Sequence, residues 1–238
     1  MIKVKHIVSF SGGKDSTAML LRMIEEGWKI DEIIFCDTGM EFPSIYRHID
    51  KVERYVGKEI IRLKAEHTFE YMMFDYEKKK GKNKGEKGYG WPDFKNRWCT
   101  SYLKRDMIRR YLKQYDSVVE YHGIALDEAH RAEKNEDGRN IQYPLIEWNT
   151  TEQDALEYCY SKGFDWDGLY ERFYRVSCWC CPLQSIPELQ QLYKYFPNLW
   201  QRLKQMDEKA WNQFRPDYSV AELEDRFYWE SRQVSLYK

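Results

Sequence analysis

Residues 4–16, VKHIVSFSGGKDS, decide the fold, because a strand pattern passes there through two glycines into a helix pattern. Residues 4–10 are apolar and rich in β-branched side chains, which predicts a buried strand. From Ser16 onward apolar residues recur at helical spacing until Gly27, where the helix is expected to stop. A glycine-rich turn between strand and helix directs backbone N–H groups and the helix dipole toward one point. The stretch therefore predicts an α/β fold with an anion site at its first turn.

The same alternation continues through the first half of the chain. Further strands are expected at residues 30–36, 58–63 and 117–123, and helices at residues 43–56 and 101–115. Strands joined by helices of this length pair in parallel with right-handed crossovers. We therefore expect a doubly wound, mostly parallel α/β sheet.

The pattern changes after Asn140. Thr150 is expected to cap a helix that runs to about Lys162. From Ile186 onward the chain is helical and aromatic, with core candidates at Tyr193, Trp200, Leu203, Trp211 and Phe214. We expect residues 1–183 to form one α/β domain that contains this anion site, and residues 184–238 a C-terminal helical appendage.

The turn at residues 11–16 carries the clearest chemistry. Its glycines allow close approach to a phosphate, the Ser11 and Ser16 hydroxyls can donate to it, and Lys14 adds positive charge. Asp15 is unusual in an anion cradle, but it suits a ligand of Mg²⁺ bound together with phosphates. Lys14 and Asp15 are therefore the candidate catalytic residues. The alternative is an ordinary glycine-rich turn with a serine cap.

Charge is distributed unevenly along the chain. The formal net charge is −1, yet residues 78–110 hold 12 basic and 3 acidic residues, a net charge of +9. Interleaved aromatic residues suit a polyanion with stackable bases, so this basic loop, residues 77–98, is a candidate nucleic-acid surface. The candidate contacts there and just beyond it are Lys78, Lys79, Lys80, Lys104 and Arg105. The alternative is a solvated, mobile loop.

Composition excludes some classes of protein. Hydrophobic residues make up 42% and aromatic residues 16%, enough to build a core. No window approaches the roughly 18 apolar residues of a membrane span, and the N-terminal segment resembles a strand rather than a signal peptide. We expect a cytoplasmic protein without a membrane partner.

The motifs resemble those of one known superfamily. Residues 11–16 match the Ser-Gly-Gly-x-Asp-Ser loop of the PP-loop, or adenine nucleotide alpha-hydrolase-like, superfamily. Residues 37–43 (DTGMEFP) and 97–104 (RWCTSYLK) resemble the narrower phosphoadenosine phosphosulfate (PAPS) reductase family. Segments 123–131, 143–145 and 178–182 continue the resemblance, which covers roughly residues 4–183.

This resemblance implies a Rossmann-like sheet with ATP or a related adenine nucleotide across the strand ends, and Mg²⁺ near Asp15. Arg131 is less clear, because this chain departs from the family pattern just before it; a surface arginine paired with Glu128 or Glu133 is the alternative. The implied nucleotide-binding residues are Ser9, Ser11, Gly12, Gly13, Asp15, Ser16, Asp37, Thr38, Gly123 and Arg131.

Cysteine spacing points to a metal or a cluster. Three of the six cysteines lie in Cys178-Trp179-Cys180-Cys181, and Cys99 lies in the other family block. The resemblance to adenylyl-sulfate reductases implies a [4Fe–4S] cluster on Cys99, Cys178 and Cys181, with Cys180 as a candidate fourth ligand. Structural Zn²⁺, with His122 or Cys180 as fourth ligand, and no metal at all are the alternatives. Cys36 and Cys159 are expected to be buried as small apolar residues.

Three functions follow from these motifs. The leading hypothesis is an ATP pyrophosphatase-type sulfurtransferase, similar in motif to the DNA phosphorothioation enzymes, with a nucleic-acid acceptor and a sulfur donor protein as candidate partners. No cysteine follows Cys181, where sulfonucleotide reductases carry their attacking thiol. A PAPS or adenylyl-sulfate reductase with its thiol supplied in trans is therefore the second hypothesis. A non-catalytic nucleotide-binding accessory protein is the third.

Overall fold

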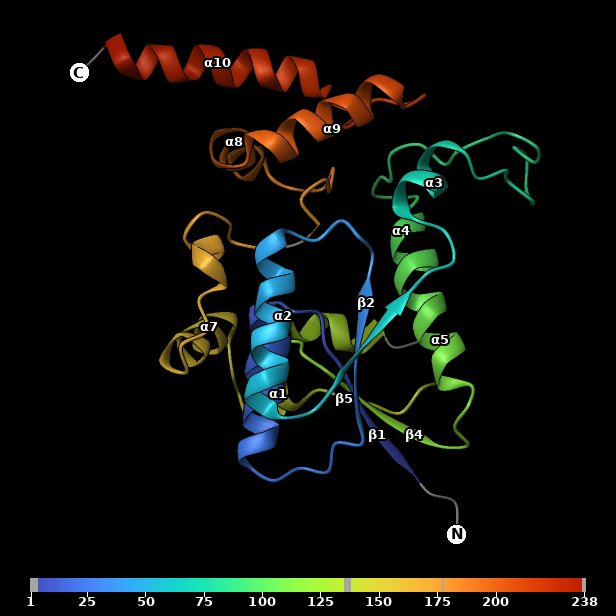
Figure 1. The fold of residues 1–238 in the computed structure, drawn as a ribbon, viewed down its shortest axis with the longest axis vertical. Helices are drawn as coiled ribbons and strands as arrows, with labels where there is room; N and C mark the ends of the chain where they lie inside the picture. The colour runs from blue at the N-terminus through green and yellow to red at the C-terminus, as the bar shows by residue number, and fades with distance from the viewer. Residues whose placement is uncertain (1–3, 135–137, 177, 237–238) are drawn as a thin grey trace.

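A five-stranded, all-parallel sheet forms the centre of the computed structural model, which describes residues 4–134, 138–176 and 178–236. The strands follow the order β3-β2-β1-β4-β5, so their carboxyl ends share one edge (Figure 1). Their bounds are β1 Lys5–Ser9, β2 Glu32–Asp37, β3 Ile60–Lys64, β4 Val118–His122 and β5 Ile141–Gln142. The expected doubly wound α/β fold is confirmed.

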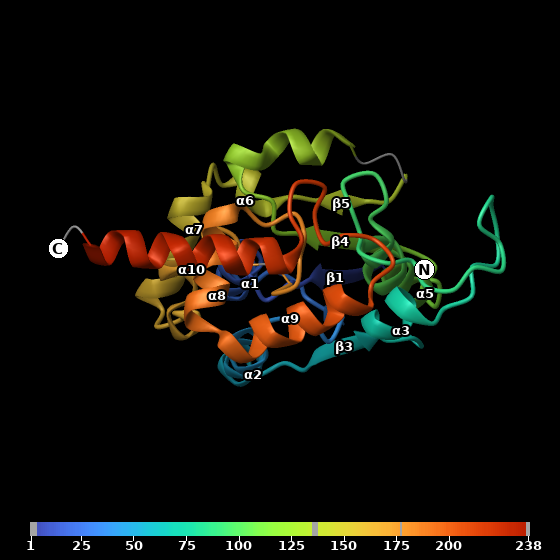
Figure 2. The ribbon, with the colours of Figure 1, turned by 90° about the horizontal axis from the view of Figure 1, so that it is seen from above.

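Helices cover both faces of the sheet. On one face α1 (Lys14–Glu25) lies between α2 (Pro43–Val56) and α7 (Glu152–Ser161) (Figure 2). On the other face α5 (Asp106–Leu112) packs on the sheet. Successive side chains of β1 point to opposite faces of the sheet. Val8 therefore packs in the core beneath α1, and Ile7 packs in the core beneath α5.

Two expected helices differ in detail from the prediction. The cap of α7 is Thr151 rather than Thr150, because the Thr151 hydroxyl accepts from the Asp154 N–H and Asp154 accepts from the Thr151 N–H. The helix expected at residues 101–115 begins earlier, as α4 (Trp98–Thr100), and passes through a π-helical turn η1 (Ser101–Arg105) into α5. The remaining short helices are α3 (Phe69–Phe74), η2 (Leu126–Lys134), α6 (Pro144–Glu147) and η3 (Trp166–Glu171).

The C-terminal helices form a separate layer above the carboxyl ends of the strands (Figures 1 and 2). They are α8 (Ile186–Tyr195), α9 (Pro197–Lys209) and α10 (Val220–Leu236). Trp200, Leu203 and Phe214 are buried as expected, and Tyr193 packs partly buried against this core. The expectation for Trp211 was wrong, since 65% of it is exposed. None of the described helices is long and apolar enough to cross a membrane.

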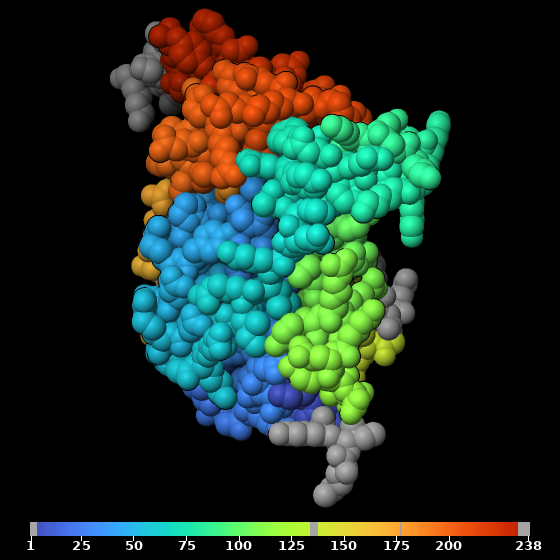
Figure 3. Space-filling model, turned by 45° about the vertical axis from the view of Figure 1, so that its right-hand side comes forward, coloured from blue at the N-terminus to red at the C-terminus, as the bar shows by residue number. Residues whose placement is uncertain are grey.

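The basic loop, residues 77–98, is an arm anchored at its base (Figure 3). Glu77 pairs with Lys87, so the lysine-rich tip folds back on itself. Trp91 is buried against the C-terminal layer: its N–H donates to Asn212 Oδ1 at 2.8 Å, its indole N–H to Asp207 Oδ1 at 3.0 Å, and its ring meets Phe214 edge-on. The C-terminal layer therefore holds the arm in place.

Candidate functional site

The loop between β1 and α1 is shaped by its own hydroxyl groups. Ser16 Oγ accepts from the Ser11 N–H at 3.1 Å and lies 2.9 Å from Ser11 Oγ. Gly12 adopts a φ of +77°, and a Cβ there would lie 3.0 Å from the Ile45 side chain. A side chain at Gly12 would therefore be both strained and crowded.

A second layer of side chains supports this loop from the protein interior. The Trp166 indole N–H donates to the Gly12 carbonyl at 2.7 Å, and Trp166 stacks on buried His48 at 4.3 Å between ring centroids. His48 Nε2 lies 2.9 Å from Thr17 Oγ1, and burial lowers the pKa of His48 to about 3. The Tyr170 hydroxyl accepts from the Lys14 N–H at 2.8 Å. The loop is thus braced by neutral groups at physiological pH.

Close backbone packing joins the loop to the end of β4. A Cβ on Gly123 would lie 2.7 Å from both Ser16 Cα and Ser16 N. Ser9 ends β1 in register with His122 of β4 and Ile34 of β2. The predicted nucleotide-binding residues Ser9, Ser11, Gly12, Gly13, Ser16 and Gly123 therefore lie together at the carboxyl edge of the sheet.

The two candidate catalytic residues lie in a charged cluster at the start of α1. Lys14 Nζ pairs with Glu152 Oε2 at 2.7 Å and with Asp15 Oδ2 at 3.6 Å. Burial raises the pKa of Asp15 to about 6; Lys14 opposes this shift, and the negative charges of Glu152 and Glu128 add to it. Among the described residues Asp15 Oδ1 is buried and has no hydrogen-bond partner. An orphaned carboxylate oxygen beside a phosphate-type loop fits a ligand of Mg²⁺.

The residues after β2 form a second polar cluster on the same edge. Asp37 accepts from the Gly39 N–H at 3.0 Å and from the Tyr46 hydroxyl at 2.8 Å. The Thr38 hydroxyl donates to buried Glu41 at 2.8 Å, and Tyr46 also donates to Glu41 at 3.0 Å. Asp37 and Thr38, both predicted to line the nucleotide pocket, are therefore held mainly by near neighbours along the chain, and Asp37 also pairs with Lys64 of β3 at 3.3 Å.

The cysteine segment is attached to this second cluster. Glu41 pairs with Cys178 through the backbone, and Cys178 Sγ lies 3.8 Å from both Glu41 Oε1 and Thr38 Oγ1. Lys104 Nζ approaches Glu41 Oε1 at 3.8 Å. Burial alone would lower the pKa of Lys104, but Cys178 and Glu41 raise it above its ordinary value. Lys104 is thus a protonated amine between the acid and the thiol.

The four candidate metal-binding cysteines come from two segments of the chain and are near enough to influence one another electrostatically. Burial raises the pKa of Cys99 and Cys180, and that of Cys178 to about 12, and the thiols also act on one another, Cys181 included. Sulfur donors of this kind suit zinc or an iron–sulfur cluster. Over the described ranges, however, no three His, Cys, Asp or Glu side chains are placed to hold one metal ion, so ligation would require the thiols to turn.

Cys180 differs from the other three, because its side chain is buried in the main hydrophobic core. His122, the alternative zinc ligand, lies instead beside Glu120 and Tyr143. The expectation that Cys36 and Cys159 are buried is confirmed.

The remaining candidates occupy different surroundings. Arg131 pairs with Glu128 on the surface of η2, as the alternative interpretation expected. Lys78 is buried, with its ammonium 3.2 Å from Glu86 and 5.2 Å from the centre of the Trp211 ring. Lys79 and Lys80 are exposed on the arm, and Arg105 is exposed on η1.

Several residues of the site gave no signal in the sequence. Glu152 lies 138 positions from Lys14, with which it pairs. Tyr170 lies 156 positions from Lys14, whose N–H donates to the Tyr170 hydroxyl. Trp166 has a φ of 51°, which is unusual for a bulky residue, and it begins a left-handed turn. Only the Asp167-Gly168 pair after it hints at that turn.

Curated relatives align with most of this chain. Two uncharacterized proteins of Methanocaldococcus jannaschii are 29% and 28% identical over 84% and 82% of the chain. The chain spans less than half of their length, 41% and 45%. Adenosine 5'-phosphosulfate reductase 1 of Bacillus subtilis is 29% identical over 70% of the chain and 68% of its own length.

A solved structure has the same fold. The phosphoadenylyl-sulfate reductase of Candida auris, in a phosphate complex, superposes with a TM-score of 0.50 at 16% identity, covering 75% of this chain and 82% of its own. The sequence profile of the phosphoadenosine phosphosulfate reductase domain matches residues 5–184, and α8, α9 and α10 lie beyond it. With its loop, its strand order and this match over most of its length, the chain belongs to the PAPS reductase family.

Proposed function

We propose that this protein binds ATP at residues 11–16 and uses it to adenylate an acceptor, which prepares the acceptor for sulfur transfer. The observation that carries the proposal is Asp15, whose Oδ1 is buried without a partner among the described residues, at the start of α1. A carboxylate repels phosphates, so it is useful in a phosphate site when a cation lies between the two. Mg²⁺ held by Asp15 would supply charge neutralisation for a leaving pyrophosphate.

The loop supports the other requirements of adenylation. An acceptor oxygen attacks the α-phosphorus, the bond to the β-phosphate bridging oxygen breaks, and pyrophosphate leaves. In the proposed complex, N–H groups at the start of α1 and the Ser11 and Ser16 hydroxyls, which bond to each other here, would donate to phosphate oxygens. The Lys14 N–H, which donates to the Tyr170 hydroxyl, is not among them. Positioning and charge stabilisation are most of what such a reaction needs from a protein.

Sulfur transfer follows in the proposed sequence. A hydrosulfide supplied by a donor protein attacks the activated atom of the adenylated acceptor. A bond from that atom to sulfur forms, its bond to the adenylated oxygen breaks, and AMP leaves with that oxygen. Cys99, Cys178 and Cys181 would hold a [4Fe–4S] cluster, or alternatively Zn²⁺, beside the second polar cluster, and an iron–sulfur cluster there could carry sulfide. Lys104 would keep positive charge next to an anionic sulfur species.

A second candidate function is reduction of adenylyl sulfate or PAPS. The B. subtilis relative and the C. auris structure carry the names of such reductases. Attack of a thiol on the sulfonucleotide sulfur would need no cation at Asp15. Dependence on Mg²⁺ therefore separates the two candidates.

The test measures binding of ATP, adenylyl sulfate and PAPS by calorimetry, with and without Mg²⁺. We expect Mg²⁺ to tighten ATP binding about tenfold, the effect of one charged contact, and Asp15→Asn to abolish that gain. Asp50→Asn is the matched control, because Asp50 is exposed and pairs with Arg62 away from the loop. Turnover of ATP to AMP and pyrophosphate with an acceptor would support the proposal. ADP as the product, or sulfite release from a sulfonucleotide without ATP, would overturn it.

A further inference from the structure

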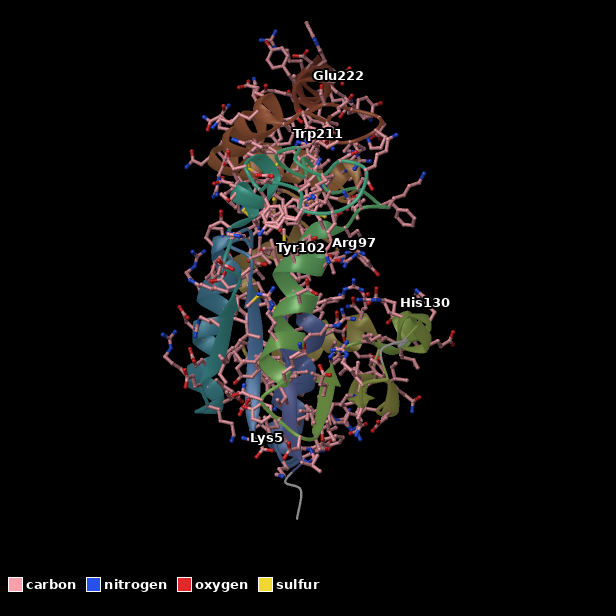
Figure 4. All side chains as sticks on the ribbon, turned by 90° about the vertical axis from the view of Figure 1, so that its right-hand side faces the viewer. Lys5, Arg97, Tyr102, His130, Trp211 and Glu222 are labelled. Carbon is pink, nitrogen blue, oxygen red and sulfur yellow. The ribbon has the colours of Figure 1, made fainter. Side chains whose placement is uncertain are left out.

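A pocket of about 580 Å³ lies between the basic arm and the π-helical turn η1. Its wall includes four aromatic residues and three cations, which are Tyr89, Phe94, Trp98, Tyr102, Lys95, Arg97 and Arg105. The pocket volume is within the range that accommodates one small organic group, such as a base with its sugar, roughly 300–1,000 Å³. In Figure 4, Arg97 and Tyr102 lie near the upper end of the helix that continues into α5, with Trp211 above them.

Phe94 and Tyr102 are the exposed aromatic side chains of this pocket, whereas the Tyr89 ring is already stacked on Tyr76 and Trp98. Tyr89 and Tyr102 lie 5.6 Å apart between ring centroids, and their hydroxyls are 3.1 Å apart. Phe94 is 84% exposed, the highest value among the large hydrophobic side chains described as exposed. A ring left in water beside a polar pocket is suited to stack on a planar ligand.

The charge of the pocket favours a polyanion. Lys95, Arg97 and Arg105 form no ion pair with any carboxylate in the described ranges, whereas Asp106, the acidic residue of the lining, approaches Arg109 at 3.9 Å. The lining thus has a net charge of +2. Unpaired cations next to aromatic faces match alternating phosphates and bases, while an acidic peptide would leave the rings without partners.

The pocket also adjoins the thiol region. Trp98 and Thr100 line it, and Cys99 lies between them in the chain. Lys104 and Arg105 are neighbours on η1, but Lys104 reaches Glu41 while Arg105 lines the pocket. A π-helical turn of this kind redirects successive side chains and is common at functional sites.

We propose that this pocket binds one unpaired base and the flanking phosphates of a single-stranded nucleic acid. The base stacks on Phe94 or on Tyr102, and Arg97 and Arg105 contact phosphates. A duplex cannot place a base there unless the base is unpaired. This inference names the acceptor class of the proposed function and rests on it. The inference also places the nucleic-acid contact at the base of the arm instead of at Lys78, which is buried.

The test is fluorescence anisotropy with labelled oligonucleotides in the absence of ATP. The probes are eight-nucleotide oligothymidylate, oligouridylate of the same length, a DNA duplex and an oligoglutamate peptide. We expect Phe94→Ala to weaken single-strand binding about 5- to 150-fold, the loss for one stacked base. We expect Arg97→Gln to reduce the salt dependence by about one counterion. The comparison of oligothymidylate with oligouridylate distinguishes DNA from RNA as the source of the strand.

Matched controls are Trp229→Ala and Arg54→Gln, since both side chains are exposed and outside the pocket. Circular dichroism melting confirms that each variant is folded. Wild-type binding by Phe94→Ala and Arg97→Gln would overturn the inference, as would equal or tighter binding of the duplex or the peptide. The oligonucleotide assay contains no ATP, so the two ideas can fail separately. If only this inference fails, Mg²⁺-dependent ATP binding remains; if only the proposed function fails, single-strand binding remains without Mg²⁺-dependent ATP binding.

Discussion

Replacement of Gly123 by alanine tests whether close backbone packing positions the phosphate loop. The added Cβ would lie 2.7 Å from Ser16 Cα and Ser16 N and 2.9 Å from Asp15 C, where ordinary contact begins at 3.4 Å. All three atoms are backbone, so no side-chain rotation relieves the clash. Overpacking of this kind costs about 1–3 kcal/mol, which for a chain of this size lowers Tm by about 2–12 °C.

The same clash should weaken ATP binding. Restoring contact displaces the start of α1 by about 0.7 Å, enough to stretch a hydrogen bond of about 2.9 Å beyond useful range. Loss of one hydrogen bond to a charged phosphate costs about 1.5–3 kcal/mol, so we expect Kd to rise roughly 10- to 150-fold by calorimetry.

Gly57→Ala is the matched control for stability. Gly57 has a φ of +63° at the end of α2, and a Cβ there would meet nothing within 4 Å. Backbone strain should therefore cost about 1–2 kcal/mol without moving the loop. Wild-type affinity in Gly123→Ala, or an equal loss of affinity in Gly57→Ala, would refute the reasoning.

Three further predictions concern pH, packing and metal content. Burial raises the pKa of Asp15 from 3.8 to about 6, so the folded protein binds a proton there more tightly than the unfolded chain does. The stability that this proton contributes is fully present below pH 3.8 and is lost as the pH rises through about 6. Without nucleotide, Asp15→Asn should thus stabilise the protein at pH 8 by at most about 3 kcal/mol and leave Tm unchanged at pH 3.5; a Tm gain equal at both pH values would contradict this. Trp91→Ala should cost about 3–5 kcal/mol and expose the arm to trypsin, while Trp229→Ala, at an exposed position on α10, should cost under about 1 kcal/mol; urea melts with similar midpoints would count against the anchoring role. Iron, sulfide and zinc assays after anaerobic purification should find metal in the wild type and none in Cys99→Ala or Cys178→Ala; metal retained in both variants would remove these thiols as ligands.

The fold was predictable because its signals are local. Apolar alternation in residues 4–10 and the spacing after Ser16 each depend on neighbours within one strand or one helix. Parallel pairing then follows from the helices that connect the strands, but the order β3-β2-β1-β4-β5 was not predicted. The observed helix boundaries differ from the predicted ones by a few residues where a capping side chain sets the helix start, as Thr151 does for α7.

The site was only partly predictable, since its second half depends on distant contacts. Ser11 and Gly12 belong to one local motif, but the Glu152 and Tyr170 contacts join parts of the chain that no periodicity connects. The prediction that Trp211 is buried failed for a similar reason. Its spacing fits a buried helix face, yet no helix forms at residue 211, and its indole instead covers Lys78 and donates to the Gly88 carbonyl.

The anchoring of Trp91 has a consequence for the order in which the chain acquires its structure during synthesis. Trp91 and its partner Asn212 are 121 positions apart, so at ribosomal rates of about 5–20 residues per second about 6–24 s separate their appearance. During that interval residues 5–184 can complete the sheet, while the indole has no partner and faces solvent. The nascent chain therefore has a period in which its arm is a target for chaperones and proteases, and that period ends only when residues 207–214 leave the exit tunnel.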